Sequence, residues 1–306
     1  MQTIRTPEER FAGTTDAFPY VPHYVDVASG DGSQLQVATY SAGPQDGETV
    51  LLLHGEPSWS YLYRHVMRRL AERGIRSVAV DLVGFGRSDK PERVDDHSYA
   101  QHVEWVREAV VEGLGLSGIT LVCQDWGGLI GLRVVTETPE LASRIVVANT
   151  GLPTGDHEMP EVWWIFRRAV EDAETLDVGR FVAAGCAAGL SDDDRAAYDA
   201  PFADEAAKSG PRAMPLLIPT SPDDPAAPAN RAAWDRLAEW DRPFLVAFSD
   251  GDPITGPMAG VFRSVVPAAA AEPHVVIEGA AHFLQEDAGV PLADAVADFI
   301  ERHPRH

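Results

Sequence analysis

The chain has 306 residues and is strongly acidic: 25 lysines and arginines stand against 47 aspartates and glutamates, for a formal charge of −22. Hydrophobic residues make up 45% and charged residues 24%, which excludes disorder, collagen and coiled coil. The negative charge repels phosphate backbones and anionic lipid surfaces, so we expect neither a nucleic-acid nor a membrane partner. No apolar run approaches the roughly 18 residues of a membrane span and no signal sequence is visible, so we expect a soluble cytoplasmic protein.

Metal and cofactor sites are not expected either. The two cysteines, Cys123 and Cys186, are too few for a disulfide framework or a zinc site. The sequence contains no phosphate-binding loop, calcium loop or paired-histidine zinc motif.

Short apolar runs alternate with helical patterns along most of the chain, which predicts a mostly parallel sheet of eight strands with helices on both faces. The first two strands are separated by Gly30-Asp31-Gly32 and are expected to form an antiparallel hairpin at one edge. The strands are predicted at His23–Ala28, Leu35–Tyr40, Thr49–Leu53, Arg76–Asp81, Thr120–Cys123, Arg144–Ala148, Phe244–Phe248 and His274–Glu278. Helices are predicted at Tyr61–Arg73, Gln101–Glu112, Leu129–Thr138, Met258–Val266 and Pro291–Arg302.

The alternation breaks between residues 152 and 231, where the composition is helical and a proline-rich stretch closes the segment. We therefore predict a helical cap over residues 152–231, inserted into a core made of residues 1–151 and 232–306. The cap is expected to lie over the carboxyl ends of the strands, where open α/β sheets bind ligands.

The strongest local signal is Val122-Cys-Gln-Asp-Trp-Gly-Gly128, an apolar strand that passes through a tight turn into a helix. A nucleophile elbow has this layout, with small residues such as Cys123 and Gly127 around a nucleophile lifted to the sheet edge. Here Asp125 occupies the nucleophile position. The alternative is that Asp125 merely caps the following helix, a position that aspartate favours.

Two later segments favour the catalytic interpretation. Asp250-Gly251-Asp252 follows the strand Phe244–Phe248, and His282 lies in a loop of small residues after the last strand. Nucleophile, acid and histidine in this chain order form the triad of the α/β-hydrolase fold. We prefer Asp252 as the acid, with Asp250 as the rival. The loop at His54-Gly55-Glu56 and the residue Trp126 are expected to supply the backbone N–H groups of an oxyanion hole.

An aspartate nucleophile suits attack on a saturated carbon, which gives an ordinary ester that water, activated by a histidine base, can hydrolyse. The leaving group then decides the substrate. An epoxide needs phenol donors, and the cap segment contains one tyrosine, Tyr198. A halide needs only N–H donors in an apolar pocket, and Trp126, Trp163 and Trp164 offer them.

The sequence resembles the haloalkane dehalogenases of the α/β-hydrolase superfamily along nearly its whole length. The resemblance rests on His54-Gly-Glu-Pro-Ser-Trp, Asp81-Leu-Val-Gly-Phe-Gly-Arg-Ser, Gln124-Asp-Trp-Gly-Gly128 and His282-Phe-Leu-Gln-Glu286. It implies the subfamily in which the acid follows the strand before the one that leads to the histidine. Asn149, an amide after the strand Arg144–Ala148, agrees with this, because the other arrangement would need an acid there.

The resemblance implies Asp125 as nucleophile, His282 as base, Asp252 as its partner, Trp126 as a halide donor and Glu56 as a helper for the hydrolytic water. The resemblance places Phe166 where the second halide-binding indole is expected, and phenylalanine has no N–H. Trp163, three residues earlier, is therefore the candidate for the second halide donor. The alternatives are Trp164 or no second donor. The implied reaction converts a small haloalkane and water to a primary alcohol and halide, without metal or cofactor, in a monomer or small homo-oligomer. An epoxide hydrolase with the same residues and a non-catalytic ligand-binding homologue are the alternatives.

Overall fold

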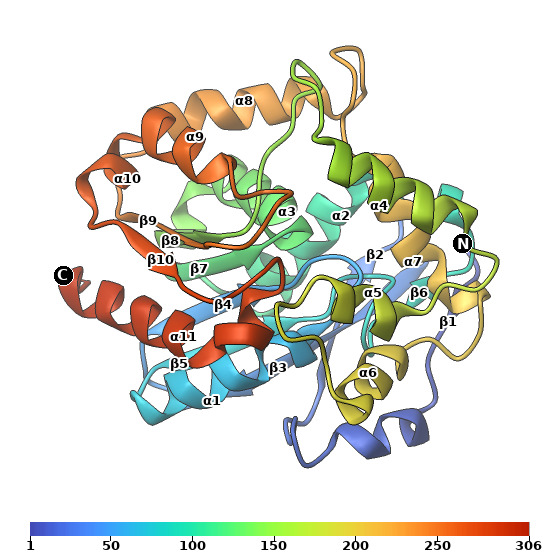
Figure 1. The fold of residues 1–306 in the computed structure, drawn as a ribbon. Helices are drawn as coiled ribbons and strands as arrows, with labels where there is room; N and C mark the ends of the chain where they lie inside the picture. The colour runs from blue at the N-terminus through green and yellow to red at the C-terminus, as the bar shows by residue number, and fades with distance from the viewer. Residues whose placement is uncertain (306) are drawn as a thin grey trace.

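A central eight-stranded sheet organises the protein in the computed structural model, which describes residues 1–305 (Figure 1). The strand order across the sheet is β10-β9-β8-β7-β4-β5-β3-β2, with β2 and β3 antiparallel at one edge. The predicted fold class and edge hairpin are therefore confirmed. The strands are β2 (His23–Ala28), β3 (Gln34–Ala42), β4 (Thr49–Leu53), β5 (Arg76–Val80), β7 (Ile119–Gln124), β8 (Ala142–Ala148), β9 (Phe244–Ser249) and β10 (Val275–Ile277). A separate pair joins β1 (Thr3–Ile4) to β6 (Lys90–Pro91).

The middle of the sheet is buried on both faces, because every residue of β7 and β9 is buried. Strands covered on both sides carry continuous apolar runs, which is why the sequence located them well. Parallel pairing of β4, β7 and β8 brings their carboxyl ends to one edge. The loops after Leu53, Gln124 and Ala148 therefore meet there, and this edge positions the candidate site.

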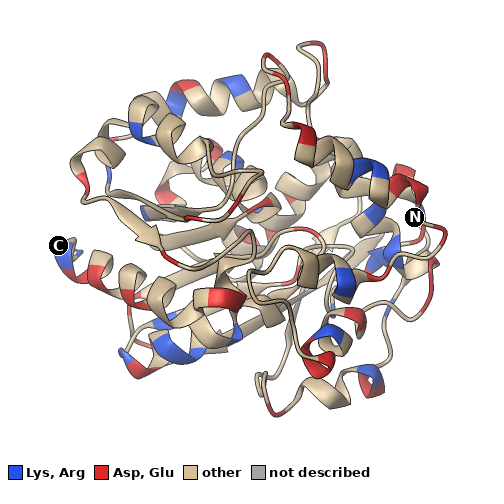
Figure 2. Ribbon diagram, in the orientation of Figure 1, with Lys and Arg blue, Asp and Glu red and all other residues tan. Residues whose placement is uncertain are grey.

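Helices cover both faces of the sheet. On one face α1 (Arg64–Glu72) packs against α11 (Leu284–Arg302). On the other face α3 (Trp126–Glu137) packs against α2 (Tyr99–Arg107) and α8 (Ala227–Ala238), and α8 contacts α9 (Met258–Val265). Shorter elements are α10 (Pro267–Ala271), the π-helical turn Glu108–Gly113, and the 3-10 turns Glu8–Thr14, Ser60–Tyr63, Val94–Asp96, Pro139–Leu141, Ala206–Lys208 and Met214–Leu217. Charged residues lie mainly on these outer helices and loops, whereas the strands are almost free of them (Figure 2).

Four helices lie within the segment predicted as a cap: α4 (Glu161–Asp172), α5 (Val178–Ala184), α6 (Asp192–Asp199) and α7 (Ser209–Ala213). Residue 231, the expected end of the cap, falls inside α8. Because α8 is one continuous helix that packs against α3, we propose that the cap ends before this helix. The division of the chain into two units otherwise stays a prediction.

Two helices begin three or more residues earlier than the sequence predicted. Helix α3 starts at Trp126 and not at Leu129, because the turn at Asp125 leads into it directly. Helix α11 starts at Leu284, but its backbone leaves helical geometry at Ala288 (φ −146°, ψ 43°). Pro291 lies in the first turn after this break, where a missing N–H costs little. Among residues 1–305, no helix combines the length and apolarity needed to cross a membrane.

Candidate active site

The turn between β7 and α3 holds Asp125 in a backbone conformation that L-residues rarely adopt, with φ 50° and ψ −127°. Gly127 makes the turn possible, because a Cβ atom there would lie 2.1 Å from the backbone oxygen of Leu53. The Asp125 side chain makes no capping hydrogen bond to α3, so the alternative of a simple helix cap is wrong. Strained residues of this kind concentrate at functional sites, and the carboxylate is directed away from its own helix.

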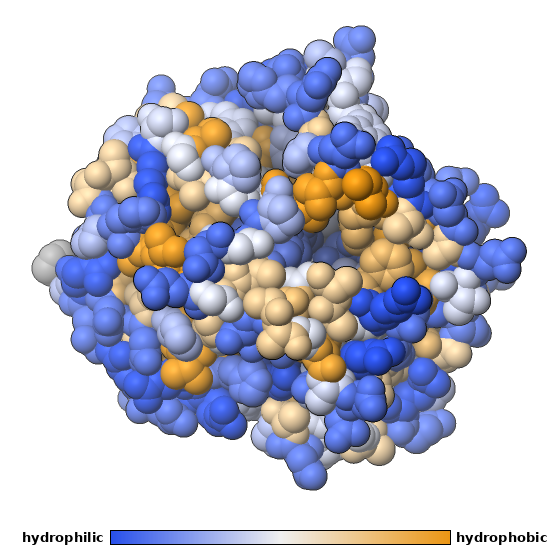
Figure 3. Space-filling model, viewed as in Figure 1, coloured by the Kyte–Doolittle hydropathy of each residue, from blue (hydrophilic) through white to orange (hydrophobic). Residues whose placement is uncertain are grey.

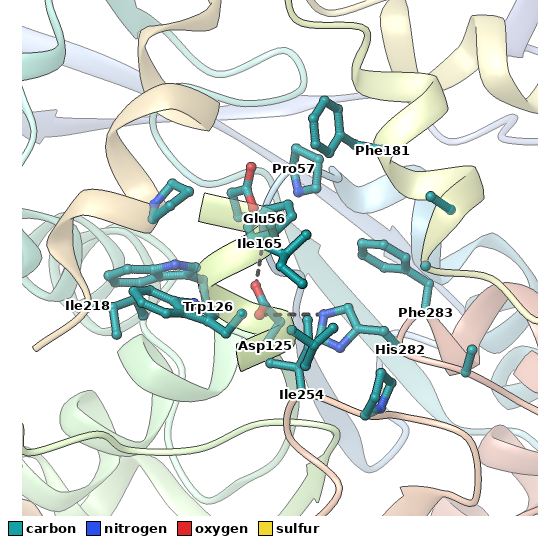
Figure 4. Close-up of a pocket in the computed structure, with 18 of the residues that line it drawn as sticks. Glu56, Pro57, Asp125, Trp126, Ile165, Phe181, Ile218, Ile254, His282 and Phe283 are labelled. Atoms are coloured by element: carbon teal, nitrogen blue, oxygen red, sulfur yellow. Dashed lines mark hydrogen bonds and ion pairs between the residues drawn. The ribbon is translucent and has the colours of Figure 1, made fainter. Parts of the chain in front are cut away.

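The Asp125 carboxylate is held between the loop after β4 and the loop after β10 (Figure 4). Its Oδ1 atom accepts the backbone N–H of Glu56 at 2.9 Å, and its Oδ2 atom lies 3.5 Å from Nε2 of His282. A Cβ atom on Gly55 would come within 2.3 Å of Oδ1, so the close approach of this loop requires glycine. The structure thus brings together Asp125, Glu56 and His282, as the sequence predicted.

Asp252, and not its rival Asp250, contacts the imidazole. Nδ1 of His282 lies 3.0 Å from Oδ2 of Asp252, an atom that also accepts a hydrogen bond from the hydroxyl of Thr255. The other carboxylate oxygen, Oδ1, accepts the backbone N–H of Ile254 at 2.9 Å. Asp250 accepts instead from the backbone N–H groups of Gly279 and Ala280, and so braces the loop that carries His282.

Charge and burial have opposite effects on the pKa values of Asp252 and His282. Burial raises the pKa of Asp252, but the hydrogen bond and charge of His282 outweigh it and lower the pKa to about 2. Burial lowers the pKa of His282, yet the carboxylates of Asp125 and Asp252 together raise it to about 10. The charges of the two carboxylates thus favour the protonated imidazole near neutral pH.

Two amide side chains, whose contacts the sequence analysis did not anticipate, position the histidine loop. The Gln124 side-chain amide nitrogen donates to the backbone oxygen of His282 at 3.3 Å and lies 3.1 Å from its Nε2 atom. The Asn149 amide nitrogen reaches the same oxygen at 3.0 Å and the hydroxyl of Ser249 at 2.8 Å. Gln124 is the last residue of β7 and Asn149 directly follows β8. This position at the carboxyl edge of the sheet is the sequence signal for their positioning role.

The Glu56 side chain is buried next to the nucleophile. Burial and the charge of Asp125 raise its pKa well above the ordinary value of a glutamate. Within the part of the chain that the structure describes, its Oε1 atom has no hydrogen-bond partner. Glu56 thus places at the edge of the cavity a carboxyl group whose raised pKa favours the neutral form and whose Oε1 atom is not hydrogen-bonded within residues 1–305.

A cavity of about 460 Å³ opens in front of Asp125, Glu56 and His282. Its other walls are largely aromatic and aliphatic and include Trp126, Trp163, Phe166, Phe181, Ile218 and Phe283. At the surface, the molecule is hollowed beside a strongly hydrophobic group of side chains over α4, where Ile165 is 55% exposed (Figure 3). Such a site suits a small apolar ligand.

Only one of the two candidate indoles on α4 lines the cavity. Trp163 lines the cavity together with Phe166 one turn further on, whereas its neighbour Trp164 does not. Among the hydrogen bonds of residues 1–305, none uses the indole N–H of Trp126 or of Trp163, whereas those of Trp59, Trp105 and Trp234 donate to backbone oxygens. Two of the side chains that line the cavity, Trp126 and Trp163, therefore carry indole N–H groups without an acceptor among residues 1–305.

No group of three or more histidine, cysteine, aspartate or glutamate side chains is placed to hold a metal ion anywhere in residues 1–305.

Comparison with known proteins identifies the family. The model of the alpha/beta hydrolase fold matches residues 48–289. The chain is 44% identical over 305 residues to a haloalkane dehalogenase of Psychrobacter cryohalolentis, with all of both chains covered, and 46% identical over 296 residues to one of Mycolicibacterium paratuberculosis, with 97% of both covered. The solved structure of the haloalkane dehalogenase DpaA from Paraglaciecola agarilytica is similar with a TM-score of 0.88 and 35% identity, over 96% of this chain and 97% of that one. The chain therefore belongs to the haloalkane dehalogenase family of α/β hydrolases.

Proposed function

We propose that the protein hydrolyses carbon–halogen bonds in small haloalkanes, giving an alcohol and a halide ion. The observation that carries the proposal is the position of Asp125, a carboxylate that needs no deprotonation, facing an apolar cavity in which Trp126 and Trp163 offer unused N–H donors. Its relatives' names agree with this reaction. The subfamily that places the acid after β9 is supported by the contact of Asp252 with His282.

In the first step an oxygen of Asp125 forms a bond to the halogen-bearing carbon, and the carbon–halogen electron pair leaves with the halide. The indole N–H groups of Trp126 and Trp163 donate to the departing halide. The water-poor walls strengthen these charged hydrogen bonds. The product of this step is a neutral alkyl ester on Asp125.

The ester changes the state of His282. Once Asp125 is esterified, it no longer has a negative charge 3.5 Å from the imidazole. One of the two charges that raise the pKa of His282 is thereby removed, while burial still lowers that pKa. The imidazole then releases its proton to solvent and becomes a base. Formation of the ester thus prepares the histidine for the second step.

In the second step His282 takes a proton from water, and the water oxygen attacks the carboxyl carbon of the ester. The negative charge that develops on Oδ1 of Asp125 is stabilised by the backbone N–H of Glu56, which already donates to that atom at 2.9 Å. The backbone N–H of Trp126 is the proposed second donor, and the Glu56 side chain helps to hold the water. The intermediate then collapses: the bond from the carboxyl carbon to the alkyl-bearing oxygen breaks, and the departing alkoxide takes the proton of the new hydroxyl group and leaves as the alcohol. The Asp125 carboxylate is restored beside protonated His282.

Halide release and intact mass together test this proposal. We expect the wild type to release bromide from 1-bromobutane, and His282→Gln to accumulate protein that carries one butyl group, because alkylation does not need the base. Asp125→Asn should carry no such group. Folded wild-type protein that releases no bromide from any of a series of bromoalkanes would contradict the function. Turnover by the wild type without an adduct in His282→Gln would contradict the two-step route.

The cavity does not favour an epoxide hydrolase. Tyr198, the tyrosine of the predicted cap, is fully buried, and its hydroxyl donates to Glu286. No tyrosine is among the described residues that line the cavity in front of Asp125. A strong donor for an epoxide oxygen is therefore missing from these walls, and styrene oxide should not be converted to the diol.

A further inference from the structure

A second cavity, of about 520 Å³, lies on the other side of Asp125. The loop of residues 151–160 forms one wall, and Trp234 of α8 together with Met258 and Val261 of α9 forms another. Asp125, Trp163, Ile218 and Ile254 line both this cavity and the one already described, whereas Glu56 and His282 line only the first. The two cavities therefore meet at the nucleophile and at one of the proposed halide donors.

The second cavity is held open by fixed contacts. Asn230 and Arg231 of α8 hold the 151–160 loop, because the Asn230 amide donates to the backbone oxygen of Pro153 at 2.6 Å and Arg231 pairs with Asp156 at 2.6 Å. The indole N–H of Trp234 donates to the backbone oxygen of Leu152, so this ring presents carbon atoms to the cavity. Among the described residues, no lining side chain of this cavity has a buried polar atom without a partner. Such walls suit a hydrocarbon and require no polar group of the ligand.

The geometry points to a preferred class of substrate: haloalkanes with the halogen on an internal carbon atom, which place one alkyl arm in each cavity. This inference rests on the proposed function. In an in-line displacement the reacting carbon lies between the Asp125 carboxylate and the halide, which we place near Trp163. Because both residues line both cavities, this carbon lies where the cavities meet. The remaining substituents of that carbon extend to the sides of the line between nucleophile and halide. Val261 and Met258 then determine how well the second arm fits.

The experiment compares 1-bromopentane, which has one butyl arm, with 5-bromononane, which has the same arm on each side. Each methylene moved from water to apolar surroundings strengthens binding about fourfold, so burial of two carbons of the second arm gives about 15-fold. Inhibition of 1-bromobutane turnover measures binding of both compounds in active protein. Quenching of indole fluorescence by bromine measures it in Asp125→Asn, where binding does not depend on turnover.

Val261→Trp is the blocking variant, because Val261 lines the second cavity and is 38% exposed, so a larger side chain does not disturb the core. Val276→Trp is the matched control, since Val276 is 42% exposed on β10 and lines neither cavity. We expect 5-bromononane to bind the wild type and Val276→Trp at least tenfold more tightly than 1-bromopentane, and Val261→Trp to lose most of that advantage. Met258→Trp, at a second point of the same wall, should behave as Val261→Trp does.

No advantage of 5-bromononane in the wild type would overturn the inference, as would an advantage that persists in both blocking variants. If 1-bromobutane is hydrolysed but 5-bromononane binds no more tightly than 1-bromopentane, this inference fails while the proposed function stands. The proposed function fails if no bromide is released from 1-bromobutane, whatever the fluorescence titrations of Asp125→Asn show.

Discussion

Trp163→Phe is the sharpest test of the proposed halide site, because it removes an N–H donor while leaving an aromatic ring in place. Trp163 is 5% exposed and lines the cavity at Asp125, and its indole N–H has no partner among residues 1–305. A hydrogen bond to a charged group contributes about 1.5–3 kcal/mol. Its loss should slow carbon–halogen cleavage about 10- to 150-fold and weaken bromide binding over a similar range.

Trp164→Phe is the matched control for this substitution. The two rings pack edge to face with centroids 4.7 Å apart, and Arg167 lies over both, so both changes remove an indole from the same small cluster. Trp164 lines neither cavity. We therefore expect Trp164→Phe to change bromide binding and turnover by no more than about threefold.

Bromide titration of the intrinsic fluorescence, pre-steady-state halide release and thermal unfolding together measure the effect. Bromide binding and cleavage that fall equally in both variants would show that the indole cluster supports the cap and does not bind halide. Unchanged cleavage in Trp163→Phe would refute the assignment of Trp163, and Trp126 would then be the sole indole donor of the site.

Two further predictions concern the catalytic histidine. Asp252→Asn should lower turnover about 10²- to 10⁴-fold and accumulate the alkylated protein, because the imidazole loses the carboxylate that orients it. Asp250→Asn should have neither effect, since the Asp250 side chain contacts only the backbone of the histidine loop. Equal loss in the two variants, measured by halide release and intact mass, would reverse that assignment. The second prediction is a pH dependence. His282 has a pKa raised from 6.5 to about 10, so its contribution to stability is complete below pH 6.5 and is lost as the pH rises through about 10. Melting temperatures should fall across this window and should fall less steeply in Asp125→Asn, where one of the two carboxylates is absent; parallel curves would contradict the coupling of Asp125 to His282.

The sequence alone located the elbow at Asp125, the order of acid and histidine, and nearly all of the sheet. These features are local: a buried parallel strand is a continuous apolar run, and a strand, a tight turn and a helix are adjacent in the chain. The glycines fit this picture, since a Cβ atom on Gly55 would collide with the Asp125 side chain and one on Gly127 with the backbone of Leu53. Family resemblance added roles for Trp126 and Glu56, whose side chains both reach the cavity.

Tertiary structure decided the choices between near neighbours. Asp250 and Asp252 are two residues apart in one loop, and only the packing of that loop against the segment of His282 directs Asp252 to the imidazole. Trp163 and Trp164 are adjacent on α4, so their side chains leave the helix in directions about 100° apart, and the seating of α4 over the sheet decides which one meets the cavity. The second cavity arises from α8, α9 and the 151–160 loop, which are distant in sequence. Contacts between such segments depend on how whole elements dock, and no short stretch of residues encodes them.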